Sequence, residues 1–185
     1  MSILKKWQAQ LHDRFLDKQS RLLHRPKQSI SFAEAQLIGI LFEATAPAER
    51  KIALDYAETL KQKGKTVKLL AFLDEAEQQA NFTFKHFSRK ELDWLLRPKA
   101  TQVDEFINTP FDYLINLYQS RKKPLEFISV LSKAHLRVGT YPAEKDCFDL
   151  MIETRAEHNL PHFVKQLDYF LKKMNSNQQH EGAII

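Results

Sequence analysis

The 185-residue chain is poor in cysteine and contains no long apolar run. Its single cysteine, Cys147, excludes an intramolecular disulfide and is typical of a reducing compartment. No stretch of about 18 apolar residues occurs, so no membrane-spanning helix is predicted. No apolar segment with a cleavage site follows Lys5 and Lys6, which argues against a secretory signal peptide. We therefore expect a cytoplasmic protein, with peripheral attachment to the inner membrane as the alternative.

The chain has only four glycines, and their placement excludes the common nucleotide-binding motifs. Such sites need a glycine-rich turn whose backbone amides approach the phosphates. The turn after the first predicted strand, residues 43–47, has no glycine, and Glu43 would repel a phosphate. His158 and His162 are four residues apart, but Pro161 lies between them and no further ligand completes a metal site. No nucleophile has a recognisable base, so we expect no catalytic residue, metal or cofactor.

The net charge of +5 is concentrated at one end of the chain. Residues 1–28 contain two acidic side chains and seven basic ones, and the charges of the remaining residues cancel. This asymmetry predicts an anionic partner for the segment, either RNA or the ribosome, or a membrane surface. The basic residues are Lys5, Lys6, Arg14, Lys18, Arg21, Arg25 and Lys27.

Residues 3–23 have the apolar spacing of an amphipathic helix, which Pro26 ends. We predict that its apolar face consists of Ile3, Leu4, Trp7, Leu11, Phe15 and Leu22. Three uses of this helix stay open. It could dock on its own domain or on a second protomer, giving a homo-oligomer. It could lie on an anionic membrane with Trp7 at the interface, or it could bind RNA.

The rest of the chain alternates apolar strands with amphipathic helices, which predicts an α/β fold. Strands are expected at 37–42, 66–73, 112–117, 136–138 and 148–152, with 82–87 as a further candidate. We predict a three-layer, Rossmann-like domain with a mostly parallel sheet of about five strands. The predicted organisation is a basic N-terminal arm (1–28), the α/β domain (29–174) and a flexible tail (175–185).

A candidate ligand site follows from this fold, because such sheets bind ligands beyond the carboxyl ends of the strands at the switch point. The stretch 118–123 is polar and basic and follows the strand 112–117. It is either an anion-binding turn or a solvated one. The residues expected around the crevice are Glu43, Thr45, Asn116, Tyr118, Ser120, Arg121 and Lys122, with Asp74 and Gly139 nearby.

The segments IGILFEAT, KHFSRKELDWLLRPKA, PFDYLINL, PLEFISVLSKAHLRVGTY and FDLMIE resemble, in order and spacing, an uncharacterised bacterial protein family. The resemblance covers nearly the whole chain and implies a small bacterial α/β protein without a known activity. Its motifs look structural, including Ser132, Ala134 and Gly139 in a Ser-x-Ala-x-x-x-x-Gly pattern. Residues 111–141 are also similar to part of the N-terminal, Rossmann-like half of heptosyltransferase-type glycosyltransferases. That likeness implies shared architecture more than shared chemistry.

Two functions are compatible with these observations. The first is a non-enzymatic binding or accessory module, whose basic N-terminal helix contacts an anionic partner or another chain. The second is a small enzyme or enzyme relic that binds a phosphorylated or sugar-like ligand in the strand-end crevice. In that case Arg121 would hold the anion and Glu43 would act as a base.

Overall fold

The computed structural model describes residues 3–22, 30–74, 82–140, 147–154 and 159–181. Six parallel strands form one open sheet in the order β3-β2-β1-β4-β5-β6. The strands are β1 (Leu37–Glu43), β2 (Thr66–Leu73), β3 (Lys85–Ser88), β4 (Tyr113–Leu117), β5 (Leu136–Thr140) and β6 (Leu150–Ile152). The helices are α1 (Ile3–Leu22), α2 (Pro47–Gln62), α3 (Thr101–Asn108), α4 (Lys123–Leu131) and α5 (Leu160–Glu181). A single 3-10 turn, Arg89–Glu91, follows β3.

This strand order is that of Rossmann-like domains, and it reverses direction between β1 and β4. The prediction of an α/β fold with a Rossmann-like sheet is thus confirmed. The sheet has one strand more than expected because the candidate segment 82–87 does join it. Residues Lys85–Ser88 pair with Leu70–Leu73 at the edge of the sheet. The capping box of Ser88 and Glu91 ends β3 and begins the 3-10 turn.

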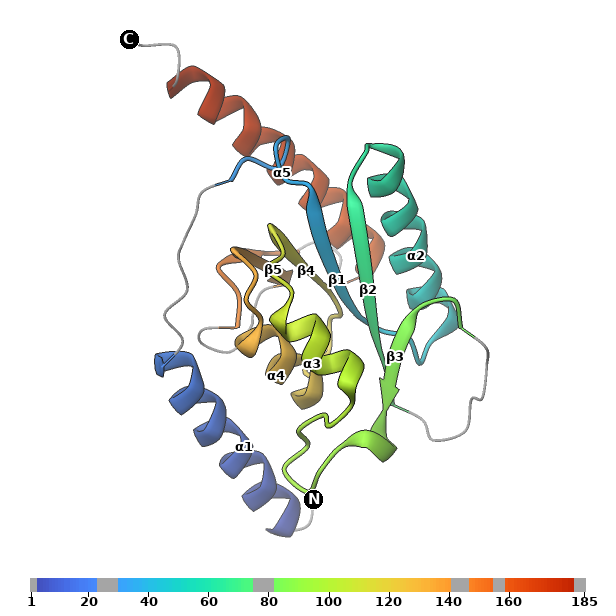
Figure 1. Ribbon diagram of the computed structural model, residues 1–185, viewed down its shortest axis with the longest axis vertical. Coiled ribbons are helices and arrows are strands. Elements are labelled where there is room, and N and C mark those ends of the chain that lie inside the picture. Colours follow the sequence, from blue (N-terminus) through green and yellow to red (C-terminus); the bar gives the residue numbers. More distant parts are fainter. Residues whose placement is uncertain (1–2, 23–29, 75–81, 141–146, 155–158, 182–185) are drawn as a thin grey trace.

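The sheet is covered by helices on both faces, which gives the three predicted layers (Figure 1). Helices α2 and α5 pack on one face, and α3 and α4 pack on the other. Successive side chains of β1 pack into the cores on opposite faces of the sheet. Ile40 and Phe42 belong to the core under α2 and α5, and Leu41 belongs to the core under α3 and α4. Because both faces of β1 are buried, its sequence is a continuous apolar run instead of an alternating one.

The Ser-x-Ala-x-x-x-x-Gly pattern is structural in this fold. Ser132 ends α4, and its side-chain oxygen accepts a hydrogen bond from the Ala134 backbone N–H at 3.2 Å. Ala134 is fully buried. Gly139 lies in β5 directly against the ring of Phe148, where an added Cβ would be 2.3 Å from a ring carbon. The glycine is therefore required by the close approach of an aromatic ring and not by a ligand.

The described residues at both ends of the chain are helical. Helix α5 continues to Glu181, so residues 175–181 of the expected tail are helical. The sequence there contains no proline or glycine before Gly182 that would end the helix. At the other end α1 covers most of the basic arm, while residues 23–29 lie outside the described part of the chain. Among the described helices, none is long and apolar enough to cross a bilayer.

Candidate functional site

The switch point of the sheet lies between the carboxyl ends of β1 and β4, and a cavity of about 490 Å³ opens at this end of the molecule. Its wall is formed by the end of β2, the segments 89–96 and 121–124, and Gln8 of α1. The cavity is rich in charge. It is lined by the cations Arg89, Arg121, Lys122 and Lys123 and by the carboxylates Asp74 and Asp93.

Lys122 is the central cation of this crevice, and it is already held by two carboxylates. Its Nζ lies 2.7 Å from Asp74 Oδ2 and 3.0 Å from Glu43 Oε1. The guanidinium of Arg89 donates a hydrogen bond to the other oxygen of Asp74. This hydrogen bond is the main cause that lowers the pKa of Asp74, and Lys122 adds to it. Burial and the neighbouring Glu43 carboxylate raise the pKa of Glu49 in the first turn of α2.

The other two cations of the segment 121–124 also have carboxylate partners. Arg121 donates to both oxygens of Glu126, with N–O distances of 2.8 and 3.3 Å, and the Glu126 side chain is almost fully buried. Lys123 forms an ion pair with Asp13 of α1 and lies 3.4 Å from Glu126. A bound anion would therefore compete with carboxylates that already neutralise these cations.

The structure brings some of the predicted crevice residues together and separates others. Ser120 Oγ lies 3.4 Å from Glu43 Oε2, at the ends of β4 and β1. Thr45 accepts a hydrogen bond from the Asp74 backbone N–H at 2.9 Å and ties the end of β1 to the end of β2. These two residues join Glu43, Asp74 and Lys122 in one cluster.

Asn116 and Tyr118 lie elsewhere, in the interior behind β4. The amide of Asn116 is fully buried and donates to the backbone carbonyl of Val138 at 2.9 Å. Tyr118 is also buried, and desolvation raises the pKa of its hydroxyl well above the ordinary value of 10.0. Strand alternation explains the difference, since side chains that follow one another along a strand point to opposite faces of the sheet and not beyond its end.

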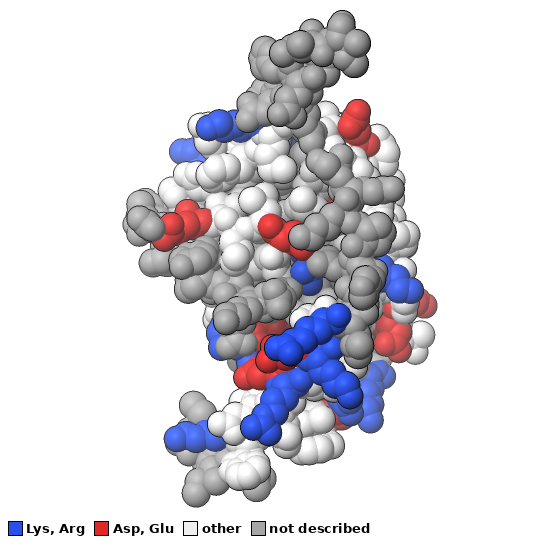
Figure 2. Space-filling model, turned by 90° about the vertical axis from the view of Figure 1, so that its left-hand side faces the viewer, with Lys and Arg blue, Asp and Glu red and all other residues white. Residues whose placement is uncertain are grey.

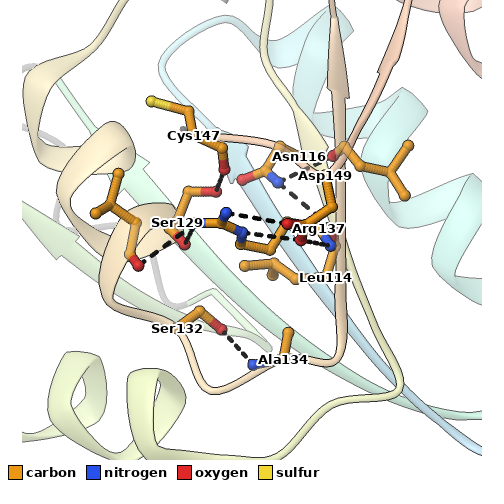
Figure 3. A network of polar contacts seen from close by, with 10 residues as sticks. Leu114, Asn116, Ser129, Ser132, Ala134, Arg137, Cys147 and Asp149 are labelled. Carbon is orange, nitrogen blue, oxygen red and sulfur yellow. Dashed lines mark hydrogen bonds and ion pairs between the residues drawn. The ribbon is translucent and has the colours of Figure 1, made fainter. Parts of the chain in front are cut away.

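A buried polar network lies close to Asn116 (Figure 3). Arg137 of β5 donates to Asp149 at 3.1 and 3.2 Å and to the backbone carbonyls of Ser129 and Val130. The backbone carbonyl of Cys147 accepts a hydrogen bond from Ser129. The network connects α4, β5 and the segment before β6, so its role is structural. Sequence reasoning missed the ion pair, although an arginine inside an apolar strand is a signal for a buried partner.

Helix α1 docks on its own domain. His12 donates through Nδ1 to the backbone carbonyl of Leu95 at 2.7 Å, and its imidazole is fully buried. The ring of Phe15 stacks on Phe127 of α4, with 6.1 Å between the centroids. Leu16 is buried at the same interface. The docked face thus runs through His12, Phe15 and Leu16.

The predicted apolar face of α1 was therefore partly wrong. Trp7 and Leu11 are exposed to 64% and 37%, on the side of the helix away from α4. The apolar residues of α1 extend around a wider arc of the helix than the arc that contacts the domain. His12, a polar residue that was not predicted to face the domain, is part of the interface. The ion pair between Asp13 and Lys123 fixes the rotation of α1 about its own axis, and in this orientation Trp7 is exposed.

The outward face of α1 carries basic residues that differ from those in the crevice. Lys6, Arg14, Lys18 and Arg21 are exposed, and none of their side chains has a hydrogen bond or ion pair with another described residue. Figure 2 shows blue side chains gathered on this side of the molecule, where α1 lies. Asp17 is the acidic neighbour on the same face. Of the other predicted arm residues, Arg25 and Lys27 lie outside the described part, as does the side chain of Lys5.

A protein family of unknown function, DUF6913, matches residues 10–174 of the chain. The chain belongs to this family. The match covers the α/β domain together with residues 10–22 of α1. No curated protein and no solved structure matches the chain. The local likeness to glycosyltransferases gains no support from these comparisons.

This DUF6913 domain offers no cluster of metal ligands within its described residues. No three side chains of His, Cys, Asp or Glu come together there in a way that could hold an ion. His158, one of the two histidines considered from sequence, lies outside that part of the chain. The candidate sites are therefore two: the strand-end crevice with paired charges, and the outward face of α1 with unpaired ones.

Proposed function

We propose that this member of the DUF6913 family is a binding module that attaches to a polyanionic partner through the outward face of α1. One observation carries the proposal. The exposed cations Arg14, Lys18 and Arg21 have no carboxylate partner among the described residues, whereas every cation of the crevice named above has one. An unpaired, exposed cation can neutralise a partner's charge without first giving up an internal ion pair.

The docking of α1 supports the same function. Its contacts with α4 and with the segment 94–97 hold the helix on a rigid α/β body. The basic residues at positions 14, 18 and 21 follow helical spacing and share one face. A partner thus meets a preformed row of positive charge, and little conformational entropy is lost on binding.

The test compares two variants of the full chain with the same change in net charge. One replaces Arg14, Lys18 and Arg21 by Gln. The control replaces Lys51, Lys165 and Lys172 by Gln on α2 and α5, which cover the other face of the sheet. Both remove three positive charges from the net +5. Binding to poly(U) RNA, to a hairpin RNA and to anionic vesicles is measured for each across a salt series.

We expect the first variant to lose roughly 100-fold in affinity for the probe that binds, because each basic residue near an anionic surface contributes about 1 kcal/mol. The control should keep most of its affinity. Equal losses in the two variants would mean that net charge alone attracts the probe, and the proposal would be wrong. Neutralisation is a sharper test than deletion of residues 1–28, since deletion would also uncover the face of α4 that α1 protects.

A second function, binding of a phosphorylated or sugar-like ligand, is supported by the position of the cavity at the switch point. The paired charges speak against it, because an anion must replace Asp74 or Glu43 as the partner of Lys122. A thermal-shift screen with nucleotides, nucleotide sugars and sugar phosphates tests this alternative. A shift that the Lys122→Gln variant abolishes would favour it over the binding module.

A further inference from the structure

The outward face of α1 combines its basic row with exposed apolar side chains. Trp7, Leu11, Arg14, Lys18 and Arg21 recur at intervals of three and four residues, so they form one stripe along the helix. The stripe is about 21 Å long at 1.5 Å per residue. Its first part, Trp7 and Leu11, is apolar, and the part towards the C-terminal end of the helix is basic.

A second exposed indole lies beside the apolar end of this stripe. The side chain of Gln8, next to Trp7, donates a hydrogen bond to the backbone carbonyl of Trp94. Trp94 is 67% exposed. The chain has only these two tryptophans, and the fold places both of them on the surface at one end of α1.

The turn that carries Trp94 is held in a fixed conformation. One oxygen of the Asp93 carboxylate accepts hydrogen bonds from the backbone N–H groups of Leu95 and Arg97, each at 2.9 Å. Leu96 has a φ of 60°, a left-handed conformation that is strained for a leucine. The backbone is thus constrained to present the carbonyls of Trp94 and Leu95 to α1. The same constraint leaves the indole of Trp94 outside the core.

We propose that this stripe is a membrane-binding surface, which lays α1 flat on an anionic phospholipid bilayer with Trp7, Leu11 and Trp94 at the headgroup boundary. The proposal rests on the proposed function and names its polyanionic partner. Tryptophan is the side chain that most favours the membrane interface, because its ring is apolar and its N–H is polar. Arg14, Lys18 and Arg21 supply the charge complementary to anionic headgroups, and their long apolar stems can extend along the lipid surface.

The apolar part of the stripe favours a bilayer over RNA. Basic residues alone would serve either partner. Leu11 has no planar ring on which a base could stack, but it gains free energy when its side chain enters hydrocarbon. Figure 1 shows α1 as a straight helix on the outside of the domain, and a linear stripe of side chains along such a helix fits a planar surface. Helices of this kind, with basic and apolar side chains on the outward surface, lie in the interface and do not span the membrane.

The two tryptophans make the proposal directly measurable, because tryptophan fluorescence, excited selectively, reports on this surface alone. The full chain and its Trp94→Phe variant, in which Trp7 is the single reporter, are titrated with vesicles. One set is phosphatidylcholine only, and the other is phosphatidylcholine and phosphatidylglycerol in equal parts. We expect a blue shift of the emission and quenching by brominated lipid with the anionic vesicles at low salt, and neither effect with the neutral ones.

A matched pair of substitutions separates insertion from nonspecific adhesion. Trp7→Ala should weaken binding to the anionic vesicles about tenfold, by the free energy of burying one large side chain. Tyr169→Ala removes a similarly exposed aromatic ring from α5, on the far side of the sheet, and should leave the affinity unchanged. Both positions are exposed, so neither change should unfold the domain, and far-UV circular dichroism checks this.

The outcomes distinguish this inference from the function on which it rests. Binding to poly(U) or hairpin RNA that depends on Arg14, Lys18 and Arg21, without binding to vesicles, would support the proposed function. The same result would overturn the inference that the partner is a membrane. Vesicle binding that Trp7→Ala does not weaken, with no blue shift, would also overturn insertion. Absence of binding to every anionic probe would overturn both.

Discussion

Replacement of Leu16 by Ala tests whether α1 is an independent docked element or part of the cooperative core. Leu16 is 7% exposed and belongs to the core cluster under α3 and α4. It comes from the one described helix that packs outside the layers covering the sheet, and α1 reaches the rest of the domain mainly through α4 and the segment 94–97. The substitution removes apolar contacts of α1 without touching its outward face.

The expected size follows from the position of Leu16. Leucine-to-alanine changes in protein cores cost about 2–5 kcal/mol, depending on how far the site can collapse. Leu16 lies at the margin of its cluster, where a single helix can settle into the space, so we expect the low end, about 2 kcal/mol. A change of that size corresponds to roughly 30-fold in an equilibrium constant. Because the six-stranded sheet keeps its own cores when α1 leaves, the loss should appear as local opening of α1.

Hydrogen exchange of individual amides measures this opening. In the Leu16→Ala variant the amides of α1 should exchange about 30-fold faster, with little change in β1 and β4. Leu60→Ala, in the core under α2, is the control and should speed exchange throughout the domain. If Leu16→Ala instead accelerates the amides of β1 and β4 as much as those of α1, then α1 unfolds only with the whole domain and the reasoning is refuted.

Three further predictions concern the core and the docked helix. Gly139→Ala should lower the free energy of unfolding by about 1–3 kcal/mol, because its Cβ would meet the ring of Phe148; the midpoint of urea unfolding measures this. Arg137→Met should cost about 2 kcal/mol in the same assay because it removes the hydrogen bonds from the buried guanidinium to the Asp149 carboxylate, and no change would mean that the pair is dispensable. Desolvation lowers the pKa of His12 from 6.5, so the unfolded or undocked state binds more protons and docking should weaken as the pH falls below 6.5. Protection factors of the α1 amides at pH 8 and pH 5, which divide out the base-catalysed intrinsic exchange rate, follow this effect, and a loss of protection at pH 5 that persists in His12→Gln would assign it to another group.

Much of the fold could be predicted from local patterns. The run Leu37–Phe42 is apolar at every position except Gly39, which is typical of a strand covered on both faces, and β1 is such a strand. The apolar spacing of residues 3–23 likewise predicted a helix, and α1 runs over Ile3–Leu22. These features depend on contacts between residues that are near in sequence, or on burial that any parallel sheet imposes, so the sequence contains enough information to place them.

The candidate site was harder to predict, because its chemistry depends on partners that are distant in sequence. Lys122 looked like a free cation at a strand end, but Glu43 and Asp74 reach it from β1 and β2. Asn116 and Tyr118 were expected at the crevice, yet the side chains of Asn116 in β4 and of Tyr118, one residue beyond it, are buried in the interior. No periodicity along the chain reveals the partners of Lys122, since they follow from which strands become neighbours.

The sequence by itself determined the class of this protein: an α/β domain with a parallel sheet, preceded by a helix that carries the excess positive charge. Hydrophobic periodicity and charge counts suffice for that, because they act through local backbone geometry and through burial. Only the tertiary structure decided which of the charges remain available. It pairs Lys122 and Lys123 with carboxylates from distant segments, and it rotates α1 so that Trp7 and the basic row face outward. Ion pairing and helix docking are contacts between distant parts of the chain, and they set the surface that a partner meets.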